Sequence, residues 1–210
     1  MRRLQLLSVW SIITSFALGF YLYPAMPDTM ASHWDTAGMP NGYVSKFWGL
    51  FLIPILSTCL YAVFVYTPLG PHRTKESSFR RYYEFFFDVL ILFFFYLYVV
   101  TVIWNTGIRI PIGQALAPAI GVLYYVIGDV LPHSKRNRLF GIRTPWTLAD
   151  DRVWEATHKK GASLFRVCGL LAVLGMITPR LLILLVIPIL ISTAYLFWYS
   201  WSAYRTLHRK

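Results

Sequence analysis

Six apolar stretches, each close to the length that crosses the hydrocarbon core of a bilayer, constrain this chain more than any other feature. A spanning helix needs about 20 mostly apolar residues. Lipid offers no hydrogen-bond partners to the backbone, so such stretches must be helical. They cover residues 4–23, 47–67, 85–104, 112–131, 162–178 and 181–200. We therefore predict an all-α, polytopic integral membrane protein with six transmembrane helices.

The composition agrees with this class, since 57% of the residues are hydrophobic and 18% are aromatic. Proline lacks the amide hydrogen of a regular helix, so Pro54, Pro118 and Pro188 are expected to kink or loosen spans two, four and six. The first apolar run is longer than the core of a signal peptide and reads as a retained helix. Cys59 and Cys168 fall in different spans, which favours buried thiols over a disulfide.

The net charge of +11 is distributed as a bilayer requires. If the N-terminus is cytoplasmic, 17 of the 20 Lys and Arg residues lie on the inner side, and only Lys46, Arg109 and Arg180 lie outside. Basic residues favour cytoplasmic loops, so we expect both termini in the cytoplasm. Because the charge is spread over every inner loop, we expect no direct binding of nucleic acid.

Three segments can be distinguished within what we expect to be one structural bundle. Residues 1–67 hold the first two spans and an extracytoplasmic loop, 24–46, which we call the cap loop. Its prolines and glycines predict a turn-rich cap and not a helix. Residues 68–111 hold the third span with its flanking loops, of which 68–84 is expected to be an inner basic loop. Residues 112–210 hold three spans and a cytoplasmic loop, 132–161, which we call the signature loop.

The signature loop has residue types too particular for a spacer. Gly141 permits a left-handed backbone, and Pro145 biases Thr144 towards an extended conformation. We expect an extended segment over 143–146. The stretch from Thr147 to Asp150 then has the pattern of a helix start, with Asp150 or Asp151 as the cap. Trp154 and His158 follow at helical spacing on one face.

Two parts of the chain resemble a known family. The run from Gly141 to Leu148, with Val153–Trp154 and Thr157–His158 behind it, resembles the signature of SdpI-type immunity proteins. These bacterial membrane proteins protect a producer cell from a secreted killing peptide. The cap loop, with His33–Trp34, Gly42–Tyr43 and Lys46, resembles a small domain of unknown function that commonly precedes the SdpI segment. Gly128–Asp129 departs from the family, which commonly has Gly-Asn there.

The resemblance implies a multi-pass protein of the cell membrane that gives resistance to an SDP-like antimicrobial peptide, without a cofactor. It also implies signalling, in which the engaged protein recruits a transcriptional repressor to the membrane. On this view the cap loop would meet the peptide through His33, Trp34, Tyr43 and Lys46. The inner docking element would consist of Gly141, Ile142, Arg143, Thr144, Pro145, Trp146, Thr147, Trp154 and His158.

Several residues keep two interpretations open. Arg143 has a planar fork suited to a partner or a lipid phosphate, but it could equally hold the loop by pairing with Asp129, Asp150 or Asp151. Intramembrane acids such as Asp88 and Asp129 are costly and suggest function, although pairing with inner-loop arginines explains them as well. His133, His158 and Asp129 could hold Zn²⁺, but they lack zinc-site spacing, so ordinary hydrogen-bonded histidines and no metal are expected.

The sequence lacks enzyme motifs such as G-x-S-x-G or a phosphate-binding glycine loop, so we expect no enzyme. An intramembrane hydrolase that uses His158 and an acid is a remote alternative. The main alternative to immunity is a small membrane transporter, or a lipid-interacting scaffold, of unknown cargo. The mid-parts of the spans offer only Ser and Thr side chains to such a cargo.

Overall fold

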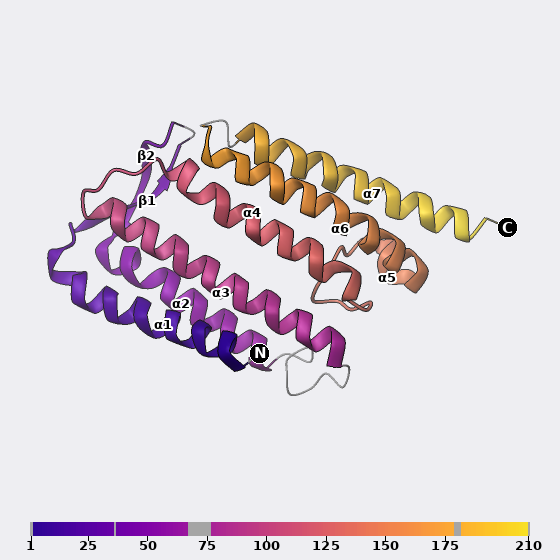
Figure 1. Ribbon diagram of the computed structural model, residues 1–210, viewed down its shortest axis with the longest axis horizontal. Helices are drawn as coiled ribbons and strands as arrows, with labels where there is room; N and C mark the ends of the chain where they lie inside the picture. Colours follow the sequence, from indigo (N-terminus) through magenta and orange to yellow (C-terminus); the bar gives the residue numbers. More distant parts are fainter. Residues whose placement is uncertain (1, 36, 67–76, 179–181, 210) are drawn as a thin grey trace. The chain divides into compact units, whose positions relative to one another are not determined.

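The computed structural model describes residues 2–35, 37–66, 77–178 and 182–209 (Figure 1). The chain divides into two compact units, residues 1–119 and 120–210. Helix α4 (Ile112–Val130) begins in the first unit and ends in the second. Each unit is described by itself.

Three long helices form the first unit, and each packs against the other two: α1 (Arg2–Leu22), α2 (Lys46–Tyr66) and α3 (Ser77–Asn105) (Figure 1). A short 3₁₀ turn, Tyr23–Ala25, ends α1. The helices approach closely at Gly19, where an added Cβ would lie 2.9 Å from the Phe51 ring. Their core includes Met30, Leu50 and Tyr98, all fully buried.

The cap loop forms a small antiparallel sheet of two strands, β1 (Thr29–Trp34) and β2 (Pro40–Ser45). The sequence predicted a structured, turn-rich cap but not this hairpin. The turn is built by Asp35, whose Oδ1 accepts hydrogen bonds from the backbone N–H groups of Ala37 and Met39, each at 2.9 Å. Gly38 supplies the left-handed residue, with φ 78°. Alternating burial along β2 shows that one face of the strand packs inward.

In the second unit, α6 (Asp151–Val173) and α7 (Ile187–Leu207) lie side by side, and the one-turn helix α5 (Pro145–Ala149) packs against both (Figure 1). Short turns flank them: 3₁₀ at Leu131–His133 and Leu174–Met176, and a π turn at Leu182–Val186. The second half of α4 meets α6 through small residues. A Cβ on Gly121 would lie 2.7 Å from the Gly169 carbonyl, so only glycine permits this approach.

Five helices in the described ranges are long and apolar enough to cross a membrane: Gln5–Ala25, Lys46–Tyr66, Arg80–Asn105, Ile112–His133 and Ile183–Leu207. The prediction of a helical, multi-pass membrane protein is confirmed. Helix α6 is not among the five, because Lys159, Lys160 and Arg166 interrupt its apolar run. Its apolar half nevertheless packs along α7, itself a candidate span. The six-span count and the cytoplasmic termini stay predictions, as do the domain boundaries.

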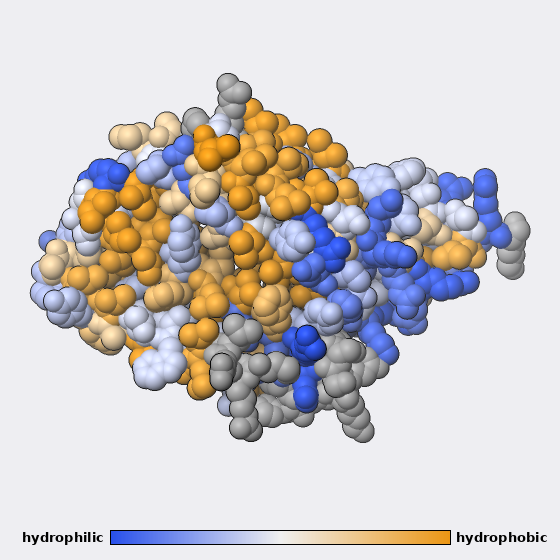
Figure 2. All heavy atoms as spheres, viewed as in Figure 1, coloured by the Kyte–Doolittle hydropathy of each residue, from blue (hydrophilic) through white to orange (hydrophobic). Residues whose placement is uncertain are grey.

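Side-chain hydropathy follows the same division within the second unit. Hydrophilic residues gather where α5, the start of α6 and the C-terminus lie, and apolar residues cover the neighbouring helix surface (Figure 2). This is the distribution expected of helices that leave a membrane into water.

The start of α3 and the exposure of Cys59 differ from the expectation, whereas the three prolines lie within spans as predicted. Helix α3 begins at Ser77, so residues 77–84 are helical and not loop; Arg73, Lys75 and Arg180 lie outside the described residues. Pro188 lies inside the candidate span Ile183–Leu207, directly after the π turn Leu182–Val186, so the regular α-helix begins only at Ile187. Pro54 and Pro118 do lie inside helices, and the Thr58 hydroxyl donates to the Pro54 carbonyl at 2.8 Å. Cys168 is buried, but Cys59 is exposed on α2.

Candidate functional site

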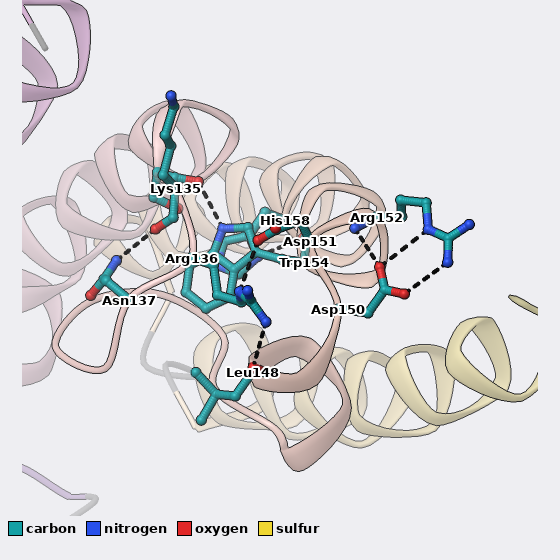
Figure 3. A network of polar contacts seen from close by, with 10 residues as sticks. Lys135, Arg136, Asn137, Leu148, Asp150, Asp151, Arg152, Trp154 and His158 are labelled. Atoms are coloured by element: carbon teal, nitrogen blue, oxygen red, sulfur yellow. Dashed lines mark hydrogen bonds and ion pairs between the residues drawn. The ribbon is translucent and has the colours of Figure 1, made fainter. Parts of the chain in front are cut away.

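The signature loop folds around His158, which is 1% exposed (Figure 3). Its ring stacks on Trp154, with 4.0 Å between the ring centroids. The Trp154 carbonyl accepts at 2.8 Å from Nδ1, so Nδ1 carries the proton. Nε2 is then an acceptor, and it receives the Ile142 N–H at 3.0 Å. One histidine thus joins two segments of the loop in a single tautomer.

Burial lowers the pKa of His158 to about 4, so the ring is neutral at physiological pH. Both ring nitrogens are occupied by backbone groups. His158 is therefore not available as a zinc ligand or as the base of a hydrolase in this structure, which removes the residue on which both alternatives depended. The described residues contain no group of three or more His, Cys, Asp or Glu side chains that could hold a metal.

Gly141 is required by this packing. Its φ of 116° lies where L side chains are strained. An added Cβ would overlap His158 Nε2 and lie 3.0 Å from two carbons of the Trp154 ring. The glycine therefore serves both the turn and the close approach of the loop to the stacked rings.

Thr144 and Thr147 fix the other side of the loop. Thr144, extended at φ −95° and ψ 162°, caps α5, and the two threonines form a reciprocal capping box. Thr147 Oγ1 also donates to the Ile142 carbonyl at 2.8 Å, and Thr144 Oγ1 donates to Ser200 Oγ of α7 at 3.0 Å. We call residues 141–147 together with Trp154 and His158 the signature knot.

The expected helix start was placed too late. The threonine box lies at Thr144–Thr147 and not at Thr147–Asp150, because Pro145 opens a separate short helix. Trp146, expected in an extended segment, is therefore helical and packs edge-on against Phe197 at 5.0 Å. The role expected of Asp150 is correct, since its carboxylate caps α6 by accepting the Arg152 N–H at 2.8 Å.

Arg143 pairs with none of the three acids that the sequence offered it. It is exposed, and its Nη1 donates to the Arg138 carbonyl at 2.8 Å. Each acid has another arginine nearby; these pairs are Asp129–Arg166 at 2.6 Å, Asp150–Arg152 at 2.9 Å and Asp151–Arg136 at 2.8 Å, the last two drawn in Figure 3. The Arg152 side chain lowers the pKa of Asp150 to about 2.

The knot divides into a buried frame and an exposed face. Thr144, Thr147, Trp154 and His158 are buried, whereas Arg143 and Pro145 are exposed. Together with the exposed Arg138 and Leu139, which precede the knot in the chain, they form what we call the knot face. A separate hollow of about 850 Å³ is lined by residues 132–136 and part of α6, including Arg136, Lys159 and Arg166. The sequence analysis did not find this hollow, because its lining comes from two separated segments.

Asp88 is buried in the first unit, at 2% exposure, and no arginine pairs with it among the side chains that the structure describes. Its Oδ1 accepts the Ser8 hydroxyl of α1 at 2.6 Å. The reason is geometric: Asp88 faces α1, where serines at positions 8, 11 and 15 are all buried. Ser11 and Ser15 bond to carbonyls of their own helix.

The four cap residues predicted to meet a peptide do not converge. His33 is exposed, with Nδ1 2.5 Å from Asn41 Oδ1. Lys46 pairs with Asp28 at 2.8 Å. The Trp34 ring packs edge-on against Trp104 at 5.5 Å, and its buried Nε1 has no hydrogen-bond partner among the described residues. Tyr43 is 59% exposed.

Of these four, only Tyr43 lines a hollow of about 680 Å³ beneath the hairpin. The opposite wall comes from the end of α3 and the connection to α4, including Trp104, Asn105 and Arg109. The sequence analysis did not find this hollow, because the connection is too short to build a site alone. Together with the hairpin it does form one, and the available signal was Arg109, one of the few basic residues predicted outside. We call this hollow the cap hollow.

Comparison with known proteins shows which families two segments of the chain resemble. The model of the SdpI/YfhL protein family matches residues 134–200, which contain the whole signature knot. This segment of the chain matches the SdpI/YfhL protein family. A second model, a domain of unknown function (DUF1648), matches residues 10–58 and contains the hairpin. Both resemblances stated from the sequence are confirmed.

One curated member of the SdpI family matches nearly end to end. The immunity protein SdpI of Bacillus subtilis (strain 168) is 25% identical over 191 residues, which are 89% of this chain and 88% of that protein. No solved structure matches the chain. With its apolar helices, this similarity supports a multi-pass protein of the cell membrane. Trp104, Asn105 and Arg109 lie outside both matched segments.

Proposed function

We propose that this protein protects the cell that makes it from a secreted, SDP-like antimicrobial peptide. The observation that carries the proposal is the similarity to the immunity protein SdpI over 89% of the chain. The matched segments include both distinctive regions, the hairpin and the signature knot, so the likeness is not limited to apolar helices.

By the predicted orientation, the cap loop faces the outside, where a secreted peptide arrives. The hairpin presents exposed side chains, among them His33, Met39 and Tyr43, above a hollow with aromatic and apolar walls. Hollows of a few hundred Å³ with mostly apolar walls are the usual form of ligand sites. The cap is accordingly the part of the chain that we assign to peptide contact.

The knot face is the part that we assign to a cytoplasmic partner, a transcriptional repressor. Its buried frame is held by hydrogen bonds on both sides of His158, so the face is presented in one conformation. Arg143 donates to the Arg138 carbonyl, and the exposed Leu139 follows Arg138 in the chain, so the face offers a partner two cations and one apolar side chain. Exposed arginines with an apolar neighbour are typical of the contacts that dominate interfaces.

Protection is tested in a sensitive bacterial host that expresses the chain and is exposed to an SDP-like peptide. Wild type is compared with Arg143→Ala, His33→Ala and Lys160→Ala at matched membrane levels. Lys160 is exposed on α6 outside the knot face and serves as the control for loss of a cation. We expect wild type and Lys160→Ala to protect; absence of protection by wild type would contradict the immunity proposal.

Signalling is tested separately in the native host, by transcript profiling before and after addition of the peptide. A set of transcripts is expected to rise in wild type and to stay repressed in Arg143→Ala. Intact protection with no transcript response in wild type would refute the repressor proposal and leave the immunity proposal standing.

A further inference from the structure

The cap hollow contains an arginine that is already oriented for a ligand. The Arg109 guanidinium carbon lies 3.7 Å from the centroid of the Trp104 ring, and Nη1 donates to the Trp104 carbonyl at 3.1 Å. Stacking and one hydrogen bond hold the side chain, so little conformational entropy is left to lose on binding. The exposed guanidinium has further N–H donors in a planar fork that matches a carboxylate.

Charge complementarity indicates what Arg109 would bind. It is the one ionised side chain among the described residues that line the cap hollow, and no described acid pairs with it. The nearby cation, Lys46, is neutralised by Asp28 at 2.8 Å. The hollow thus has one positive charge without a counterion, and the complementary ligand carries one negative charge.

The remaining lining favours an apolar chain beside that charge. Met39, Tyr43 and Ile110 provide apolar surface from opposite sides of the hollow. Thr29 and Tyr43 also line the hollow, and neither hydroxyl has a hydrogen-bond partner in the described part of the chain. The N–H and C=O groups of a peptide can form hydrogen bonds with these hydroxyls, whereas a lipid tail has no such groups. This difference favours a peptide over a lipid.

The hollow is also rigidly built. Asn105 Oδ1 accepts the Ala31 N–H at 2.8 Å, and Asn105 Nδ2 donates to the Ala31 carbonyl at 3.0 Å. One side chain at the end of α3 therefore pairs with the backbone of β1 as a neighbouring strand would. The hairpin is fixed at a set distance from the wall that carries Arg109, and such pre-organisation favours a specific ligand.

We propose that the cap hollow binds the C-terminal end of an apolar secreted peptide, with Arg109 holding the free carboxylate and Met39, Tyr43 and Ile110 packing against the last side chains. The identity of the occupant as a secreted peptide rests on the proposed function. A chain end fits better than an internal acid, because it places a carboxylate directly beside apolar side chains without interrupting an apolar sequence.

The test uses the full chain in phosphatidylcholine nanodiscs and a dansylated apolar tetrapeptide, Val-Leu-Ala-Phe, as the free acid and as the C-terminal amide. A charge-assisted bidentate contact predicts that wild type binds the acid about 10- to 100-fold more tightly than the amide. Arg109→Gln is expected to lower acid binding to the level of the amide while amide binding persists, which shows that the hollow is still formed.

The matched control is Lys160→Gln, which removes an exposed cation of α6 that does not line the cap hollow and is expected to leave the acid-to-amide ratio unchanged. Equal binding of acid and amide by wild type, or no binding of either, would overturn the proposal. Phosphatidylglycerol nanodiscs that abolish tetrapeptide binding would identify a lipid phosphate as the occupant and also overturn it. If wild type keeps the acid-to-amide ratio but does not protect the host, the immunity proposal fails and the binding proposal for the cap hollow stands.

Discussion

The substitution Gly141→Ala tests the signature knot most sharply, because the added methyl group has two separate effects. At φ 116° any L residue is strained, at a cost of about 1–2 kcal/mol. The new Cβ would also overlap His158 Nε2 and separate it from the Ile142 N–H. Loss of the bond between the buried His158 ring and the half-buried Ile142 N–H costs a further 1–3 kcal/mol, roughly. The free energy of opening the knot should therefore fall by about 2–5 kcal/mol.

Hydrogen–deuterium exchange of the full chain in nanodiscs, followed on peptides that cover residues 138–148, measures this opening. Since each 1.4 kcal/mol is tenfold, exchange at Ile142 should accelerate by about 30-fold or more. The control is Gly107→Ala, which has a comparable φ of 100° but nothing within 4 Å of the added Cβ. The acceleration of exchange is measured in the loop that carries each substitution. If both substitutions accelerate it by the same small factor, the argument that contact with His158 makes Gly141 necessary is refuted.

Three further predictions concern the same framework. The pKa of His158 is lowered to about 4, so its contribution to stability is present above the ordinary pKa of 6.5 and is lost as the pH falls towards 4. The free energy of opening the knot should therefore fall by roughly 3 kcal/mol at low pH. It is measured by hydrogen–deuterium exchange, corrected for the intrinsic exchange rate at each pH, and His158→Gln should remove the pH dependence. Asn105→Ala leaves two backbone groups of Ala31 unpaired and should weaken hairpin protection from proteolysis by about 1–3 kcal/mol; Thr106→Ala, an exposed neighbour, should have no effect. Thr147→Val keeps the shape but removes the capping box, and should destabilise α5 by about 1–3 kcal/mol in the same exchange experiment; unchanged protection would contradict the cap.

The transmembrane helices could be predicted from the sequence because length and hydropathy suffice in lipid, where the backbone has no alternative to internal hydrogen bonds. The hairpin could not, because its strands are six residues each and contain Pro40 and Gly42, which are uncommon in strands. Its specific signal is the Asp35 side chain that closes the turn, and a single Asp in a loop has many other uses.

The candidate site shows the same limit. Helical spacing correctly placed Trp154 and His158 on one face, since that information is local. The partner of Arg143 could not be read, because three acids and several arginines are near it in sequence and only the folded loop assigns them. The cap hollow depends on residues far apart in the chain, Tyr43 and Arg109, whose proximity follows from packing alone.

The central claim, immunity to a secreted peptide, is tested most directly by the concentration of an SDP-like peptide that kills a sensitive host. The account predicts that cells with this chain in their membrane survive a concentration that kills cells with an empty vector. It also predicts that the Lys160→Ala control protects as well as wild type. Equal killing of both strains, with the chain present in the membrane at the level of a protective relative, would contradict it.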